Sequence, residues 1–208
     1  MSFLKKYSLI IILFCFLFSS LLLLGSVNRN QEFLLLGCYL IAFLSFLIIL
    51  YLLLSGKVVV EFNFLLVLAV VIRVFLFFYF PNLSDDFFRF SWDGNVFLAG
   101  SNPFEFKPID FHFPNHTIEE FANNNLLSNS DTYFQNGMNS NNYYSVYPPI
   151  AQYIFASCSF LAEDDLFQNV ICLRIFLLCF EIIGWYFMLK ILIYYNLDRL
   201  KSMIYILN

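Results

Sequence analysis

The chain changes character at the stretch Ser84-Asp85-Asp86-Phe87-Phe88-Arg89-Phe90-Ser91-Trp92-Asp93-Gly94. This stretch begins four residues after a long apolar run that ends at Phe80. Nearly everything before it has the composition of a membrane anchor, and a polar loop follows it. Two adjacent carboxylates directly outside a bilayer are unusual, so the rest of the chain is interpreted outward from them.

The composition is that of an integral membrane protein. Of the 208 residues, 61% are apolar and only 12% are charged, whereas soluble domains carry about 25% charged residues. The formal net charge is −4, and residues 81–146 hold eight acids against two bases. Because no basic patch is present, the sequence predicts no nucleic-acid partner.

Three apolar runs precede the acidic stretch, and we expect residues 1–80 to form three transmembrane helices. Each run is long enough to cross about 30 Å of hydrocarbon: residues 7–24, 33–54 and 58–80. The lysines before the first run and after the second would be cytoplasmic under the positive-inside tendency. Three crossings then place the loop of residues 81–146 on the extracytoplasmic side.

The second half of the chain returns to apolar sequence. Residues 148–162 would span only about 22 Å as a helix, which is short for a crossing. A juxtamembrane or re-entrant helix over residues 147–162 keeps the later basic residues cytoplasmic, so we favour it over a crossing. Residues 169–195 are predicted to form another transmembrane helix, and 200–208 to begin a further span. The predicted fold class is an all-α polytopic membrane protein.

Within the loop, residues 84–99 are predicted to form a short amphipathic helix. Ser84 is the expected N-cap, which places both aspartates in the first turn, where the helix dipole favours negative charge. The apolar face would comprise Phe88, Trp92, Val96 and Ala99, and the polar face Asp85, Arg89 and Asp93. We expect this helix to lie along the membrane surface.

The adjacent carboxylates of residues 85 and 86 could take part in catalysis or in metal binding. Asp85 and Asp86 could act as a general base, hold a divalent cation, or divide those roles; solvated acids at a helix start are the alternative. Arg89 could bind a phosphate or form an i, i+4 ion pair with Asp85 or Asp93. These residues leave both readings open.

Charges also occur within the apolar runs. Arg73 and Arg174 are candidates to bind a phosphate at a span end, although Arg174 could instead extend its side chain to the interface. Glu181 lies deeper in the last span. Because charge at that depth is costly and usually faces protein or a wet cavity, we predict a packing or site role for Glu181.

Three segments in order resemble the GT-C membrane glycosyltransferases, most closely the bacterial polyprenyl-phosphate-sugar-dependent hexosyl- and mannosyltransferases. They are the 84–94 stretch, Ala99-Gly100-Ser101-Asn102-Pro103-Phe104, and Tyr147-Pro148-Pro149-Ile150-Ala151-Gln152. In that family an acidic motif opens the first large extracytoplasmic loop, and a tyrosine or histidine followed by two prolines begins the helix that closes it. The resemblance covers roughly residues 58–208.

The resemblance implies a function and a set of site residues. A mannose-like hexose would pass, with inversion, from a polyprenyl-phosphate donor to a hydroxyl of a glycan, lipid or protein at the outer face of a bacterial cell membrane. Asp85 would be the general base, and Asp86 would assist it or help to bind a divalent cation. The candidates for binding substrate or phosphate are Arg89, Asp93, Tyr147 and Arg174.

Two other expectations accompany this interpretation. Members of the family are considerably longer, so the chain is expected to be the N-terminal part of such an enzyme. The competing functions are a transporter or flippase for lipid-linked sugars and a non-catalytic membrane subunit. A transporter would place its functional polar groups near the bilayer midplane.

Overall fold

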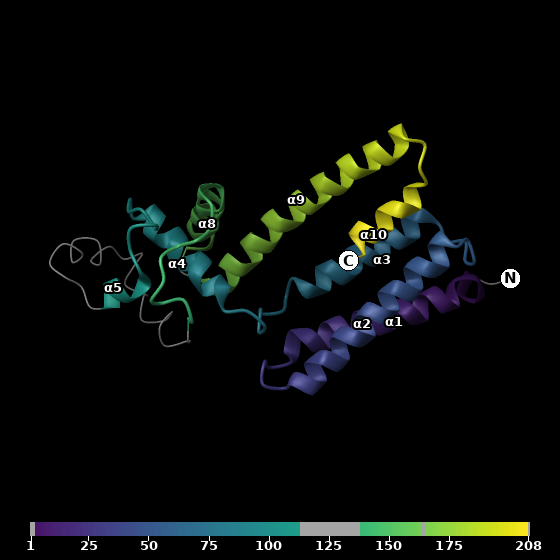
Figure 1. Ribbon diagram of the computed structural model, residues 1–208, viewed down its shortest axis with the longest axis horizontal. Helices are drawn as coiled ribbons and strands as arrows, with labels where there is room; N and C mark the ends of the chain where they lie inside the picture. The colour runs from purple at the N-terminus through teal and green to yellow at the C-terminus, as the bar shows by residue number, and fades with distance from the viewer. Residues whose placement is uncertain (1–2, 113–137, 164, 208) are drawn as a thin grey trace. The chain divides into compact units, whose positions relative to one another are not determined.

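The computed structural model describes residues 3–112, 138–163 and 165–207, and every regular element in those ranges is helical (Figure 1). Most of the asparagine-rich sequence at residues 123–142 lies outside the described residues. The helices are α1 (Phe3–Ser26), α2 (Glu32–Leu54), α3 (Phe62–Leu76), α4 (Asp86–Leu98), α5 (Pro108–His112), α8 (Pro149–Ala162), α9 (Leu166–Tyr194), the short 3-10 helix η1 (Arg199–Ser202) and α10 (Met203–Ile206).

Within the described ranges, three helices are long and apolar enough to cross a membrane: Tyr7–Ser26 of α1, Glu32–Leu54 of α2 and Leu166–Tyr194 of α9. This confirms the all-α prediction and indicates a multi-pass integral membrane protein. The α3 helix has only 15 residues and is therefore shorter than the predicted run of residues 58–80. The helix ends at Leu76, with Phe77 as its C-cap, so the last residues of the predicted run lie outside it.

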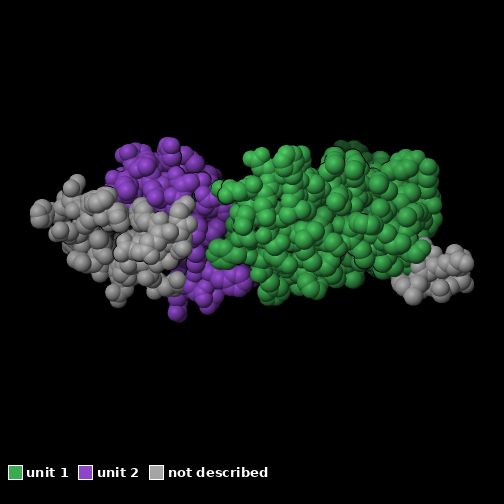
Figure 2. Space-filling model, turned by 90° about the horizontal axis from the view of Figure 1, so that it is seen from below, with its two compact units in different colours: residues 1–83, 178–208 green, residues 84–177 purple. Residues whose placement is uncertain are grey.

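The chain divides into two compact units, coloured separately in Figure 2. Unit 1 comprises residues 1–83 and 178–208, and unit 2 comprises residues 84–177. Unit 1 holds α1, α2 and α3, the second half of α9, and the two short helices at the end of the chain. Each unit has its own buried core.

The core of unit 1 is a layer of aliphatic and aromatic side chains between its helices. The α1 helix packs along α2 and also contacts α3. The residues predicted to begin a further span instead form η1 and α10, whose Met203 and Ile206 are buried in this core. Many large apolar side chains of the long helices remain exposed, as Phe16 and Leu36 do, which suits helices that face lipid.

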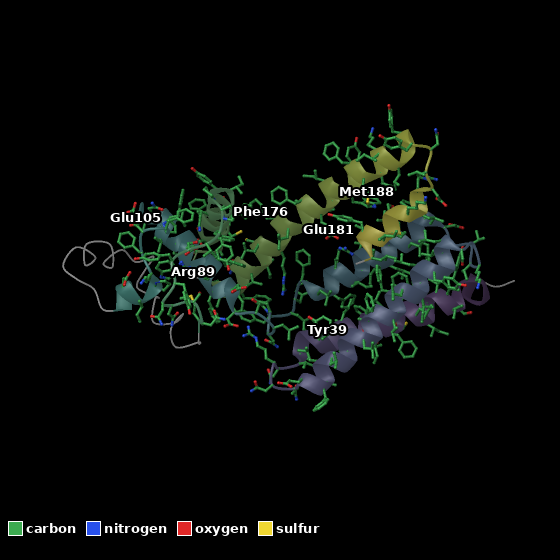
Figure 3. The ribbon with its side chains drawn as sticks, viewed as in Figure 1. Tyr39, Arg89, Glu105, Phe176, Glu181 and Met188 are labelled. Atoms are coloured by element: carbon green, nitrogen blue, oxygen red, sulfur yellow. The ribbon has the colours of Figure 1, made fainter. Side chains whose placement is uncertain are left out.

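Two charged side chains of unit 1 that are far apart in sequence form an ion pair. Arg73 Nε on α3 donates to Glu181 Oε2 on α9 at 3.1 Å, and Arg73 Nη2 pairs with the other carboxylate oxygen. Figure 3 marks Glu181 on α9. Arg73 Nη1 also donates to the carbonyl of Ala69. The side chains are only 17% and 27% exposed, so the two deep charges neutralise one another.

Unit 2 is organised by the packing of α4 against α8. Trp92 and Val96 of α4 and Cys158 of α8 are fully buried. At the crossing, a Cβ atom added to Gly94 would lie 2.5 Å from the carbonyl oxygen of Phe155. Glycine at this position therefore sets how closely the two helices approach.

The structure corrects two expectations about α4. Asp85, rather than Ser84, occupies the N-cap position, and the helix begins at Asp86. The polar face does not lie open on the surface, because Arg89 is 2% exposed and Asp93 is fully buried. Segments that follow α4 in the chain cover that face, which helical periodicity within residues 84–99 could not reveal.

Replacing Glu181 with Gln should destabilise unit 1, because it leaves the Arg73 guanidinium without its counter-charge. We expect a loss on the order of 3 kcal/mol, measured as a lower melting temperature in detergent. Removing both charges with Arg73→Met and Glu181→Leu should restore most of it. The control Glu32→Gln alters an exposed acid at the start of α2 and should change little. Equal effects of Glu181→Gln and Glu32→Gln would contradict the pairing.

Gly94→Ala should push α4 away from α8, since the backbone carbonyl it meets cannot move independently. Overpacking of this kind costs roughly 1–3 kcal/mol, and the buried Cys158 thiol should become more reactive towards maleimide. The matched control is Gly37→Ala in α2, where a Cβ meets nothing within 4 Å. That change should be neutral or stabilising by about 0.5–1 kcal/mol.

Candidate functional site

The acidic start of α4 is held by a serine hydroxyl. Ser84 Oγ accepts a hydrogen bond from the backbone N–H of Asp86 at 3.2 Å and donates one to Asp86 Oδ2 at 3.0 Å. Asp85 occupies the N-cap position but makes no side-chain capping hydrogen bond. The Asp86 side chain is exposed and that of Asp85 is half-buried. Ser84 therefore satisfies the N–H of Asp86, the first residue of the helix, whereas a side chain at the N-cap would accept from Phe87 or Phe88.

One turn further along α4, Arg89 and Asp93 form a buried ion pair. Arg89 Nε donates to Asp93 Oδ1 at 2.7 Å. Arg89 Nη1 donates to the carbonyl oxygens of Ser140 and Tyr143, at 3.2 and 2.7 Å, and the guanidinium lies 5.1 Å from the centre of the Trp92 ring. This is the intrahelical ion pair that the sequence left open as the alternative to phosphate binding.

The second oxygen of Asp93 joins α4 to the segment that opens α8. Asp93 Oδ2 accepts from Ser145 Oγ at 2.6 Å and from Gln152 Nε2 at 3.1 Å. Gln152 Nε2 also lies 2.7 Å from Ser145 Oγ. All three side chains are buried. The buried Asp93 carboxylate thus accepts three hydrogen bonds, one of them from the Arg89 guanidinium, and these partners compensate for its removal from water.

A second polar contact ties the same helices together. Ser159 Oγ of α8 donates to the carbonyl oxygen of Ser91 in α4 at 3.3 Å, and it accepts from Asn169 Nδ2 of α9 at 3.0 Å. The contact of Ser159 with Ser91 lies at the Gly94 crossing, and the contact of Gln152 with Asp93 lies about two turns earlier along α8. Together they fix the register between α4 and α8.

Tyr147, the residue before the two prolines, packs beside the acidic end of α4. Its ring lies 4.9 Å from that of Phe90 and 5.5 Å from that of Phe155, edge to face in both cases. Burial, followed by the negative charges of Asp86 and Asp93, raises the pKa of Tyr147, and Arg89 opposes the shift. The phenol therefore keeps its proton at neutral pH and can donate a hydrogen bond.

Four of the six predicted site residues lie together in unit 2. Arg89 pairs with Asp93, and the charges of Asp86, Asp93 and Arg89 are close enough to Tyr147 to shift its pKa. Figure 3 marks Arg89 among the side chains of α4. Asp85 adjoins this group at the N-cap of α4. The sixth candidate, Arg174, lies on α9 and is half-buried.

Two members of the buried network, Ser145 and Gln152, were missed as site residues in the sequence. Gln152 belongs to the proline-containing segment, and a polar residue on the first turn of an otherwise apolar helix signals a buried hydrogen bond. Ser145 carried no such signal. In the described part of the chain, no three His, Cys, Asp or Glu side chains come together to hold a metal, and a cation at Asp85 and Asp86 stays a prediction.

No family model, curated protein or solved structure matches this chain. The resemblance to GT-C glycosyltransferases therefore rests on the residues and order of the three segments. In unit 2 these segments are neighbours in space: the acidic stretch forms α4, and the proline segment opens α8, which packs on it. What the segments do chemically is argued from that geometry.

Asp93→Asn should destabilise the protein more than Asp86→Asn. Removing the Asp93 charge leaves a buried guanidinium without its counter-ion, which costs roughly 3–5 kcal/mol and should lower the melting temperature by about 10 °C. Asp86 is exposed, so its neutralisation should cost no more than about 1 kcal/mol. Thermal unfolding in detergent measures both. A stable, fully folded Asp93→Asn variant would show that Asp93 is not structural.

Proposed function

We propose that the protein transfers a hexose from a polyprenyl-phosphate donor to an acceptor hydroxyl at the extracytoplasmic membrane face. Asp85 is the general base of this proposal. The observation that carries it is the grouping at the acidic end of α4, where Asp85 stands at the N-cap next to Asp86 and the charges of Asp86, Asp93 and Arg89 act on Tyr147. Ser84 holds the backbone of this turn by accepting a hydrogen bond from the N–H of Asp86.

The reaction assigns each group a simple task. The Asp85 carboxylate takes the proton of the acceptor hydroxyl while that oxygen attacks the anomeric carbon of the donor sugar. The bond from that carbon to the phosphate oxygen breaks, and the electron pair leaves with the polyprenyl phosphate, so the configuration inverts. A divalent cation held by Asp85 and Asp86 would neutralise charge on the phosphate. The protonated Tyr147 phenol can donate a hydrogen bond to the same group.

The buried network supports this assignment by positioning. Asp93 ties α4 to Ser145 and Gln152 on either side of Tyr147, so the phenol is held beside the acidic end of α4. Catalytic groups need such rigid second contacts, because misplacement by about 1 Å can reduce a rate 10²-fold. In this scheme Arg89 and Asp93 act as positioning residues.

The competing transport function depends on Glu181, the deepest acidic residue identified in the sequence. Its carboxylate is paired with Arg73 within unit 1, which leaves it less suited to recognise a charged substrate. Transport of a lipid-linked sugar without any transfer, or the absence of both activities, is the outcome that would favour a transporter or a non-catalytic subunit.

Asp85→Asn should lower the rate of transfer about 10²–10⁴-fold and leave the melting temperature nearly unchanged, because Asn has nearly the shape of Asp and the Asp85 side chain makes no capping hydrogen bond that could be lost. The assay uses the full chain in nanodiscs with a synthetic polyprenyl-phosphate hexose and follows release of the polyprenyl phosphate in the presence of oligosaccharide acceptors.

The matched control is Asp165→Asn, which alters an exposed acid that accepts hydrogen bonds from Gln168 at the start of α9. It should keep wild-type turnover. Wild-type turnover by Asp85→Asn would remove Asp85 from the mechanism. A loss confined to Asp86→Asn would move the role of base to the neighbouring residue.

A further inference from the structure

A cavity of about 240 Å³ lies in unit 2, where the end of α4 meets the beginning of α8. Most of its walls come from the two segments that follow the acidic stretch in the resemblance, residues 99–104 and 147–152, and Phe97 and Tyr153 complete them. The residues that matter for its chemistry are Phe97, Ser101, Phe104, Gln152 and Tyr153. The cavity is distinct from the acidic end of α4.

Two buried polar atoms of this lining have no hydrogen-bond partner in the described part of the chain: Gln152 Oε1 and Ser101 Oγ. Gln152 is 1% exposed and Ser101 is 9% exposed. The amide nitrogen of Gln152 donates to Asp93 and Ser145. The amide oxygen is therefore the atom of this side chain that could accept a hydrogen bond from a ligand. Unpaired buried polar atoms are destabilising, so a ligand hydroxyl that reaches these two atoms would be stabilised by both.

The rest of the lining is uncharged and consists of three aromatic rings together with Gly100, Asn102, Pro103 and Pro149. The Phe97 and Tyr153 rings lie 5.1 Å apart at an interplanar angle of 67°, and Phe104 and Tyr153 are partly open to solvent. No charged side chain lines the cavity, so nothing there balances a phosphate or a carboxylate. Its volume is below the roughly 300–1,000 Å³ of drug-sized sites, so it has room for one small ring.

We propose that this cavity binds one neutral sugar ring. Ring hydroxyls hydrogen-bond to Gln152 Oε1 and Ser101 Oγ, and the C–H face of the ring packs on the electron-rich faces of Phe97 and Tyr153. Both requirements, few convergent polar atoms and an aromatic wall, are those of a small-molecule site.

The distance of the cavity from the acidic end of α4 indicates which unit of the substrate it holds. Phe97 lies about three helical turns beyond Asp86 in α4, roughly 16 Å along the axis, which is farther than a single ring extends. The bound ring is therefore not the one that reacts at the acidic end. This step rests on the proposed function: the cavity holds a distant unit of the acceptor, and the acceptor is an oligosaccharide or longer glycan.

Binding is tested without turnover. The full chain in nanodiscs is titrated with methyl α-mannoside, methyl α-glucoside and a neutral mannotetraose, and saturation-transfer NMR reports contact. Ser101→Ala should weaken binding on the order of 10-fold, and Tyr153→Ala should weaken it at least as much, whereas Tyr153→Phe should retain it.

The matched controls lie on α8 outside the cavity. Ser157→Ala removes a hydroxyl that bonds only its own helix, and Phe160→Ala removes an exposed ring; both should bind as the wild type does. Absence of saturation transfer from every sugar, or equal binding by Ser101→Ala, Tyr153→Ala and the controls, would overturn the site. Preference for a sugar phosphate over the neutral glycoside would overturn its assigned chemistry.

The two proposals fail separately. Asp85→Asn should bind mannotetraose normally although it cannot transfer. Binding by a wild-type protein that shows no transfer would support the sugar site and contradict the glycosyltransferase. Transfer to mannotetraose with an unchanged KM in Tyr153→Ala would contradict the acceptor role of the cavity and leave the transfer reaction standing.

Discussion

The buried carboxylate of Asp93 is the constraint on which unit 2 depends. It pairs with Arg89 in its own helix and accepts hydrogen bonds from Ser145 and Gln152. A charge removed from water is tolerated only when partners of this kind surround it, so the segment before α8 and the first turn of α8 must lie against α4. That one requirement places Tyr147 beside the acidic end of the helix and Gln152 in the wall of the sugar-sized cavity.

The same physics acts in unit 1 with a different result. Arg73 and Glu181 belong to apolar helices that a membrane would surround, and they pair with one another. In a low-dielectric environment each charge alone would be costly, whereas the pair is neutral. The ion pair therefore links α3 to the second half of α9. The polar side chains to which a chemical role is proposed all lie in unit 2.

Both close packing and hydrogen bonding hold α4 against α8. Gly94 allows the helices to approach until backbone meets backbone, and Ser159 adds a polar contact at the same crossing. The two ends of α4 therefore belong to two different candidate sites. The first turn presents two carboxylates whose backbone is held by Ser84, and the last turn contributes Phe97 to a cavity with unsatisfied buried oxygens.

The sequence by itself determined the membrane character, the all-α class, the α9 span to within a few residues and the acidic helix start, because long apolar runs and helical periodicity are local properties. The burial of Arg89 and Asp93 was decided only by the tertiary structure. Their i, i+4 spacing predicted an ion pair or a phosphate site equally well, and residues some fifty positions later cover them. The partnership of Arg73 with Glu181, and the meeting of Ser101 with Gln152 around one cavity, likewise join distant segments. No pattern within either segment encodes such contacts, since they depend on how the helices pack.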